Sequence, residues 1–200
     1  MKKLTIIIPV FNQEKLILRA LDSIPIRDDI EIIVINDGST DQTKEVIENY
    51  DFKNLTIIID SPINEGCAAS LNKGIELAHG EYILQLDSDD YLITNNFNLF
   101  LDEIKESHED LIFFINEINN GELWVPGITE GLCDHVCLYK KDIIGDTRYP
   151  ILRCTAGRTF HDNILEKEHS EFYTTKLIYH YNYPREGSNV DLYMKGLLKP

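Results

Sequence analysis

The chain has 200 residues, of which 43% are hydrophobic and 26% are charged, and this length suits one domain with a sizeable core. Its formal charge of −15 argues against general nucleic-acid binding, because such binding relies on Lys and Arg contacts with phosphates. The longest apolar runs have only the length of a strand, and no small-residue cleavage site follows Met1-Lys2-Lys3. We therefore expect a cytoplasmic protein with no transmembrane segment and no signal peptide.

The cysteines give no sign of a zinc site or a disulfide framework. None of the four forms a Cys-x-x-Cys pair, and no nearby His or Cys completes a zinc set around Cys133 and Cys137. We expect reduced and mostly buried thiols.

Strands and helices alternate along the first half of the chain. Apolar β-rich runs predict strands at 4–10, 31–35, 55–59 and 81–86. Helical periodicity predicts helices at 14–24, 40–50 and 67–78, with Ser39 or Thr40 as the cap of the second. This alternation predicts an α/β fold with a parallel sheet.

Polar loops follow three of these strands, and they contain Asn12, Asp37, and Asp87 with Asp89. The carboxyl ends of parallel strands share one rim, so we expect these side chains to converge on one ligand. Crowded carboxylates repel one another unless a cation neutralises them, and Mg²⁺ or Mn²⁺ suits such oxygen ligands when phosphates complete its shell. The alternative is a solvated acidic turn, since Asp and Ser favour turns.

The second half is less regular. We expect helices at 97–107, 141–144 and 163–168 and strands at 110–118, 123–125, 136–139 and 172–181, with a hairpin turn at 119–122. No repeat, low-complexity tract or linker is visible, so residues 1–200 are predicted to form one domain.

Four segments resemble the motifs of family-2 glycosyltransferases of the GT-A fold. They are Ile7 to Asn12, Val34 to Asp41, Asn64 to Ile75, and Leu86 to Asp90, in the order and spacing of the family. The resemblance implies a Rossmann-like, mostly parallel sheet with helices on both faces and a small C-terminal acceptor-side extension. It divides the chain into a nucleotide-sugar-binding half, 1–92, and an acceptor-side half, 93–200.

The same resemblance implies a set of donor-site residues. Asp37 would contact the base or ribose of a UDP-sugar donor, Asp87 would lie near the ribose or sugar, and Asp89 would hold a Mn²⁺ or Mg²⁺ ion at the diphosphate. The other expected nucleotide-sugar contacts are Pro9, Phe11, Asn12, Asn72, Ser88 and Arg185. The family often has Arg immediately before the position of Asn72, where this chain has Leu71.

The second half carries the expected catalytic residue. Residues 160–165 resemble the segment in which inverting members keep an acidic pair at the start of a helix, and His161 here stands in place of the first acid. Asp162 would then be the general base that deprotonates the acceptor hydroxyl, and helix capping is its alternative role. His180 is expected as a further metal ligand, with a packed or surface histidine as the alternative. Trp124 is a candidate for stacking on an acceptor sugar, or else a core or hairpin residue.

These features predict a hexosyl- or N-acetylhexosaminyl-transferase that acts on a glycan or another hydroxyl acceptor. The alternative is a non-catalytic sugar-nucleotide-binding accessory protein on a degenerated GT-A scaffold. Haloacid-dehalogenase-like phosphatases fit poorly, because they need Thr or Val where Tyr91 follows the Asp-x-Asp motif. Sugar nucleotidyltransferases have a Gly-rich opening loop that this chain lacks.

Overall fold

A computed structural model describes residues 2–119, 121–126, 137–152, 156–182 and 195. The strands in this part of the chain are β1 (Leu4–Val10), β2 (Ile30–Asp37), β3 (Leu55–Ser61), β4 (Tyr82–Gln85), β5 (Tyr91–Leu92), β6 (Leu111–Ile118), β7 (Leu123–Trp124), β8 (Cys137–Lys140) and β9 (Glu171–Tyr181). The helices are α1 (Ile17–Asp22), α2 (Thr43–Glu48), α3 (Cys67–Leu77), α4 (Thr94–Glu103), α5 (Lys141–Ile144) and α6 (Ala156–Leu165).

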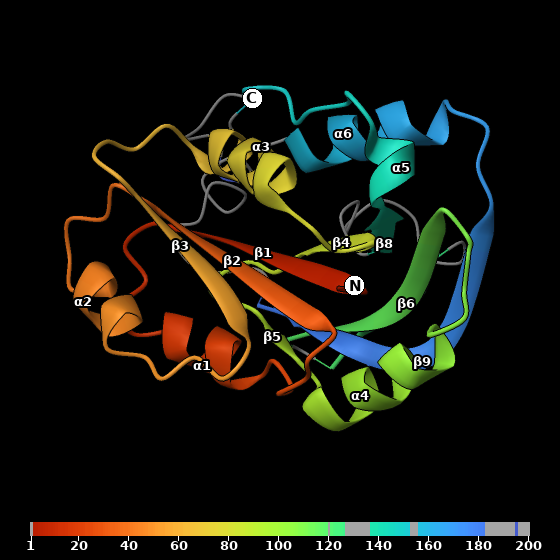
Figure 1. The fold of residues 1–200 in the computed structure, drawn as a ribbon, viewed down its shortest axis with the longest axis horizontal. Coiled ribbons are helices and arrows are strands. Elements are labelled where there is room, and N and C mark those ends of the chain that lie inside the picture. Colours follow the sequence, from red (N-terminus) through yellow and green to blue (C-terminus); the bar gives the residue numbers. More distant parts are fainter. Residues whose placement is uncertain (1, 120, 127–136, 153–155, 183–194, 196–200) are drawn as a thin grey trace.

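The described strands form one sheet in the order β3-β2-β1-β4-β8-β6-β9-β5, with β7 paired to β6 outside this path (Figure 1). In the first half, β1 pairs in parallel with β2 and β4, and β2 pairs in parallel with β3. All residues of β1, β2 and β4 are buried, as their continuous apolar runs predict for strands covered on both faces. The second half is mixed: β8 runs antiparallel to β4 and β6, whereas β9 runs parallel to β6.

Helices cover both faces of the sheet, as predicted. One core cluster contains buried residues of α1, α2 and α4, and the other contains buried residues of α3, α5 and α6. Figure 1 shows these two groups of helices on opposite sides of the strands. Each cluster also includes residues of β1, β4, β6 and β8, so the two halves of the sequence share one continuous sheet and both cores.

Several element boundaries differ from the sequence predictions. The helix α6 replaces the helix expected at 163–168 and begins at least seven residues earlier. The strand β5 was not predicted, because a two-residue strand carries no periodic pattern and exists only through its antiparallel pairing with β9. The predicted cap of α2 was also wrong: the N-cap residue is Gln42, which makes no side-chain cap hydrogen bond, and the amide of Thr43 donates instead to Asp41 Oδ1 at 3.0 Å.

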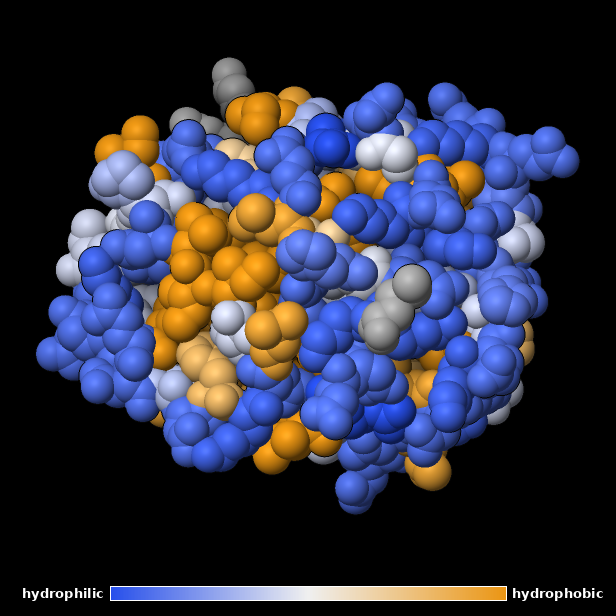
Figure 2. All heavy atoms as spheres, in the orientation of Figure 1, coloured by the Kyte–Doolittle hydropathy of each residue, from blue (hydrophilic) through white to orange (hydrophobic). Residues whose placement is uncertain are grey.

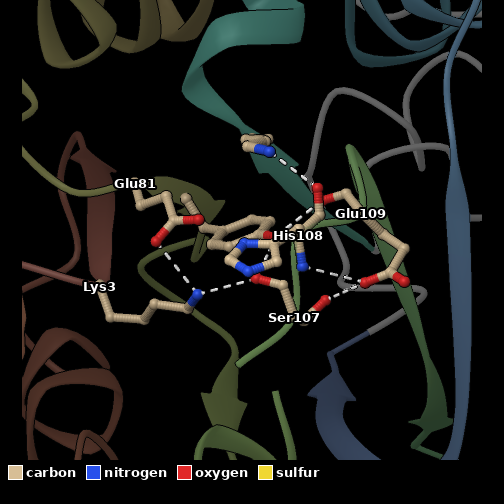
Figure 3. Close-up of polar contacts among 7 residues, drawn as sticks. Lys3, Glu81, Ser107, His108 and Glu109 are labelled. Carbon is tan, nitrogen blue, oxygen red and sulfur yellow. Dashed lines mark hydrogen bonds and ion pairs between the residues drawn. The ribbon is translucent and has the colours of Figure 1, made fainter. Parts of the chain in front are cut away.

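A group of polar contacts fixes the amino-terminal rim of the sheet (Figure 3). Lys3 Nζ lies 3.1 Å from both Glu81 Oε2 and the Ser107 carbonyl oxygen, so it joins the starts of β1 and β4 to the α4–β6 connection. The buried Tyr82 hydroxyl donates to the Glu109 carbonyl oxygen at 2.7 Å. These contacts hold the end of the sheet opposite the polar loops.

Apolar side chains reach the surface in the region of β3 and α3 (Figure 2). Among the described strands, β3 lies at the sheet edge and pairs with β2 alone, and its residues Leu55 and Ile58 are exposed. Within the described ranges, no helix is both long enough and apolar enough to cross a membrane.

Candidate active site

The loops that follow β1 and β2 are joined through Asn12. Its φ of 52° is a left-handed conformation that Asn adopts more readily than most residues. Asn12 Oδ1 accepts the amide of Thr40 at 2.8 Å, and the Asn12 amide donates to Ser39 Oγ at 3.0 Å. Beside it, Pro9 is buried in β1 and Phe11 is exposed. The expected nucleotide-lining loop is therefore rigidly tied to the next one.

Asp37 is the last residue of β2, and it organises the start of α3. Its two carboxylate oxygens accept the backbone amides of Glu65 at 2.9 Å and Gly66 at 2.8 Å. The next residue, Gly38, has a φ of +70°, and a Cβ at that position would lie 2.5 Å from the Ile63 carbonyl carbon. Only glycine fits this close approach, so the Asp37-Gly38 pair sets how the 63–66 segment meets the sheet.

The three carboxylates of the acidic loop after β4 differ in how deeply they are buried. Asp87 and Asp89 are half-buried, whereas Ser88 and Asp90 are buried. Asp90 accepts the Tyr179 hydroxyl at 2.6 Å and the Asn182 amide at 2.8 Å. Burial, and then the negative charges of Asp87 and Asp89, raise the pKa of Asp90 well above its usual value. Asp90 is thus the buried carboxylate that anchors the loop, whereas Asp87 and Asp89 keep part of their surface exposed.

The thiol of Cys67 is affected by carboxylates from both of these loops. Cys67 is the first residue of α3, and its side chain keeps exposed surface. The pKa of its thiol is raised, mainly because the surrounding protein displaces water from the sulfur. The negative charges of Asp87, Asp37 and Asp89 raise it further. Carboxylates from the ends of β2 and β4 therefore act on one point at the head of α3, as the shared rim predicted.

The segment before α6 also reaches this rim. Tyr149 donates its hydroxyl hydrogen to Gln85 Oε1 at 3.1 Å, and Gln85 Nε2 donates to Asp87 Oδ1 at 2.6 Å. Asn72 was expected to contact the donor, but both ends of its amide bind the Tyr149 backbone, at 2.8 and 2.9 Å. In this structure Asn72 holds Tyr149, and its contact with a nucleotide-sugar stays a prediction.

A stack of three side chains lies on the other side of the acidic loop. Tyr91 stacks on His180 with ring centroids 4.4 Å apart, and the Arg19 guanidinium lies 4.9 Å from the Tyr91 ring centre. Arg19 also donates to the Asp89 carbonyl oxygen. The His180 ring nitrogens lie 3.5 Å from a carboxylate oxygen of Glu117 and 3.1 Å from Asn119 Oδ1. Both ring nitrogens of His180 thus lie near polar groups of β6 and the residue after it, and its role as a metal ligand also stays a prediction.

The remaining expected site residues fall in three places. Asp162 is an exposed residue within α6, where its carbonyl oxygen accepts the Glu166 amide, so the helix-capping alternative is wrong. Trp124 packs against one core cluster from β7, and its buried indole nitrogen has no hydrogen-bond partner among the described residues. Arg185 lies outside the described residues.

The acidic loop carries two half-buried carboxylates, Asp87 and Asp89, whose fit to a divalent cation can be examined. Among the described residues, no group of three or more His, Cys, Asp and Glu side chains is arranged to hold a metal. Mg²⁺ and Mn²⁺ bind with one or two carboxylates when substrate phosphates and water supply the other oxygens. The negative charges of Asp87 and Asp89, which both act on Asp90 and Cys67, fit such a shared site.

Sequence comparison assigns the family. Residues 5–164 match the model of Glycosyl transferase family 2. The chain belongs to this family. It is 32% identical over 126 residues to the uncharacterized glycosyltransferase EpsJ of Bacillus subtilis, covering 61% of this chain and 37% of that protein. It is 36% identical over 116 residues to the poly(ribitol-phosphate) beta-glucosyltransferase of Bacillus spizizenii, covering 54% and 18%. The chain thus spans well under half the length of either family-2 relative.

Solved structures confirm the GT-A fold. Staphylococcus aureus TarS 1–349 in complex with UDP-GlcNAc superposes with a TM-score of 0.82 at 23% identity, over 94% of this chain and 60% of that one. The mannosyltransferase PcManGT of Pyrobaculum calidifontis, in complex with GDP-Man and Mn²⁺, gives a TM-score of 0.70 at 16% identity, over 92% and 58%.

Sequence reasoning missed three residues of this rim: Cys67, Gln85 and Tyr149. Cys67 opens a helix directly after the Asn64-Glu65-Gly66 segment, and Gln85 is the one polar residue in the apolar run before Asp87. Both positions could have been suspected. Tyr149 carries no local signal, because only the tertiary fold brings it to Gln85.

Proposed function

We propose that the chain transfers a hexosyl or N-acetylhexosaminyl group from a UDP-sugar to a hydroxyl acceptor, with inversion and with Mn²⁺ or Mg²⁺ as cofactor. The observation that carries this proposal is the parallel pairing of β1 with β2 and β4, which puts Asp37 and the acidic loop after β4 at one rim of the sheet, with Asp37 bound to the amides of Glu65 and Gly66 just before α3. Relatives suggest the donor class: Staphylococcus aureus TarS is a poly(ribitol-phosphate) beta-N-acetylglucosaminyltransferase, and its structure was solved with UDP-GlcNAc. The acceptor proposed here is a glycan or another polyhydroxyl compound.

The donor half of the proposal uses residues 1–92. Asp37, whose carboxylate accepts the amides of Glu65 and Gly66, would contact the base or ribose. Asp87 would bind near the ribose or sugar, and Asp89 would hold the cation. When bound, the cation would offset the negative charge that develops on the departing diphosphate. Proximity of Arg19 to the Asp89 backbone would keep this loop in place during transfer.

The acceptor half uses residues 93–200, and Asp162 is its proposed general base. A base must take the proton from the acceptor hydroxyl as that oxygen attacks the anomeric carbon. The exposed position of Asp162 on α6 leaves its carboxylate accessible to an acceptor from solution. The halves share one sheet, which supports a single catalytic domain, and the expected cytoplasmic location belongs to the same proposal.

Donor binding is tested by the thermal stability of the wild type and of Asp89→Asn with UDP and MnCl₂. A ligand at 100 times its Kd stabilises the native state by about 2.7 kcal/mol, which corresponds to a rise of about 5 to 10 °C in Tm for a chain of this size. We expect this rise for the wild type with both components and not for Asp89→Asn. An equal rise without the metal would contradict the role of Asp89.

Catalysis is tested by the release of UDP from UDP-glucose and UDP-GlcNAc with a panel of glycan acceptors. We expect Asp162→Asn to bind UDP normally and to lower acceptor-dependent release by about 100-fold or more, the usual contribution of a general base. Glu166→Gln, which changes an exposed carboxylate one helical turn away, is the matched control. Binding without any acceptor-dependent release in the wild type would favour the non-catalytic accessory protein.

A further inference from the structure

We propose that Tyr149, acting through Gln85, is a positioning residue for Asp87, and that the same contacts fix α6 relative to the donor site. The expected effect on donor binding rests on the proposed function, because Asp87 is a proposed donor contact. The contacts themselves are independent of that function. They join residues that are 64 positions apart, Gln85 and Tyr149, to the acidic loop.

The direction of the hydrogen bonds explains how Tyr149 controls Asp87. The Tyr149 hydroxyl donates to Gln85 Oε1, so the amide nitrogen of Gln85 faces the Asp87 carboxylate and donates to it at 2.6 Å. In the flipped amide, the Gln85 oxygen would face a carboxylate oxygen, and two acceptors would then oppose each other. The Asp87 carboxylate therefore selects this orientation of the amide, and the Tyr149 hydroxyl, by donating to Gln85 Oε1, holds the Gln85 side chain in place from its other end.

Tyr149 is itself held on two sides. The Asn72 amide accepts the Tyr149 backbone N–H at 2.8 Å and donates to its carbonyl oxygen at 2.9 Å. The Tyr149 ring stacks on Phe160 with centroids 4.0 Å apart and planes at 4°. Tyr149 is 6% exposed and Gln85 is 7% exposed, so water competes little with their hydrogen bond.

Phe160 extends this connection to the acceptor side. It belongs to α6, two residues before Asp162, and it packs in the same core cluster as Ile83 of β4. A shift of α6 would move the ring on which Tyr149 rests, and the hydroxyl would leave Gln85. The contacts of Gln85, Tyr149 and Phe160 thus connect Asp87 to the helix that carries the proposed base, although the two acids come from different halves of the chain.

Tyr149→Phe isolates this contact, because it removes the hydroxyl and keeps the ring that stacks on Phe160. Its matched control is Tyr82→Phe. Tyr82 lies at the opposite end of β4 from Gln85, and its buried hydroxyl donates to the Glu109 carbonyl oxygen. We expect both variants to lower Tm by a few degrees, as the loss of one buried hydrogen bond does. If the Tyr149 hydroxyl only stabilises the fold, Tyr149→Phe should show no effect beyond this decrease in Tm.

Binding of UDP with MnCl₂, measured by calorimetry, separates the two variants. We expect Tyr149→Phe and Gln85→Met to raise the Kd about threefold to tenfold, the cost of one hydrogen bond, and Tyr82→Phe to leave it unchanged. An unchanged Kd in Tyr149→Phe, or an equal increase in Tyr82→Phe, would overturn the inference.

A second readout needs no nucleotide. The side-chain amide resonance of Gln85, assigned from its loss in Gln85→Met, should shift in both Tyr149→Phe and Asp87→Asn. If it shifts in neither, the inference is wrong whatever the wild type binds. If it shifts in both while the wild type fails to bind UDP, the connection stands and the proposed function fails.

Discussion

Glu31 is a fully buried carboxylate at the amino-terminal end of β2, and its replacement tests how this rim is held together. Its Oε2 accepts the Thr5 hydroxyl at 2.7 Å and the His79 amide at 2.9 Å, and its Oε1 lies 2.9 Å from His79 Nδ1. The side chain of Glu31 is 0% exposed, whereas that of His79 is 70% exposed. Glu31 therefore ties β1 to the turn between α3 and β4.

Glu31→Leu keeps an apolar volume but leaves the Thr5 hydroxyl and the His79 amide without their acceptor. Each buried donor left unpaired costs about 1 to 3 kcal/mol, so we expect a loss of roughly 4 kcal/mol in the free energy of unfolding. That loss corresponds to a decrease of about 8 to 16 °C in Tm. Glu31→Gln keeps one acceptor oxygen and loses only the charge, so its expected cost is about 1 kcal/mol at pH 7.

The same carboxylate gives a pH dependence of known sign. Burial alone would raise the pKa of Glu31, but hydrogen bonds from the His79 amide, the Thr5 hydroxyl and the His79 ring hold it below its usual value. A lowered folded-state pKa means that the stabilisation is complete above the unfolded value of about 4.3 and is lost as the pH falls through the folded value. The stability difference between the wild type and Glu31→Gln should therefore shrink below about pH 4.

Urea unfolding of the wild type and the Glu31 variants, at pH 7 and from pH 3 to 5, measures these differences. The contributions of carboxylates that are present in both proteins cancel in the comparison. Glu81→Gln is the control: Glu81 is a partly exposed carboxylate at the same rim that pairs with Lys3, and its loss should cost at most about 1 kcal/mol. A Glu31→Leu variant within about 1 kcal/mol of the wild type would refute the reasoning, because two orphaned donors cannot cost so little.

Two further predictions concern the polar loops. Gly38→Ala should lower the free energy of unfolding by more than about 1 kcal/mol and weaken UDP binding, because its Cβ would meet the backbone of Ile63 and Asn64 at a positive φ; unchanged urea unfolding and UDP affinity would contradict this close approach. Manganese binding, followed by electron paramagnetic resonance in the presence of UDP, should be lost in Asp89→Ala. The same measurement on His180→Ala decides whether that histidine joins the metal shell, since a ligand's removal would weaken binding at least tenfold and a packed residue's would not.

The sequence by itself determined the donor half of the fold. Continuous apolar runs such as 4–10 can only be strands buried on both faces, and their alternation with helices requires parallel pairing. Because parallel strands end on one rim, the positions of Asp37, Asp87 and Asp89 after their strands were enough to predict their convergence. The motif order was enough to predict the family.

Tertiary structure alone decided which side chain does what at that rim. Three carboxylates look alike in the run from Asp87 to Asp90, and contacts with Tyr179 and Asn182, both far along the chain, identify Asp90 as the buried anchor. Asn72 resembles a donor contact by motif, yet the chain folds Tyr149 onto its amide. Such pairings are set by packing between distant segments, and the local patterns of hydrophobicity and turn residues that predict strands and loops carry no information about them.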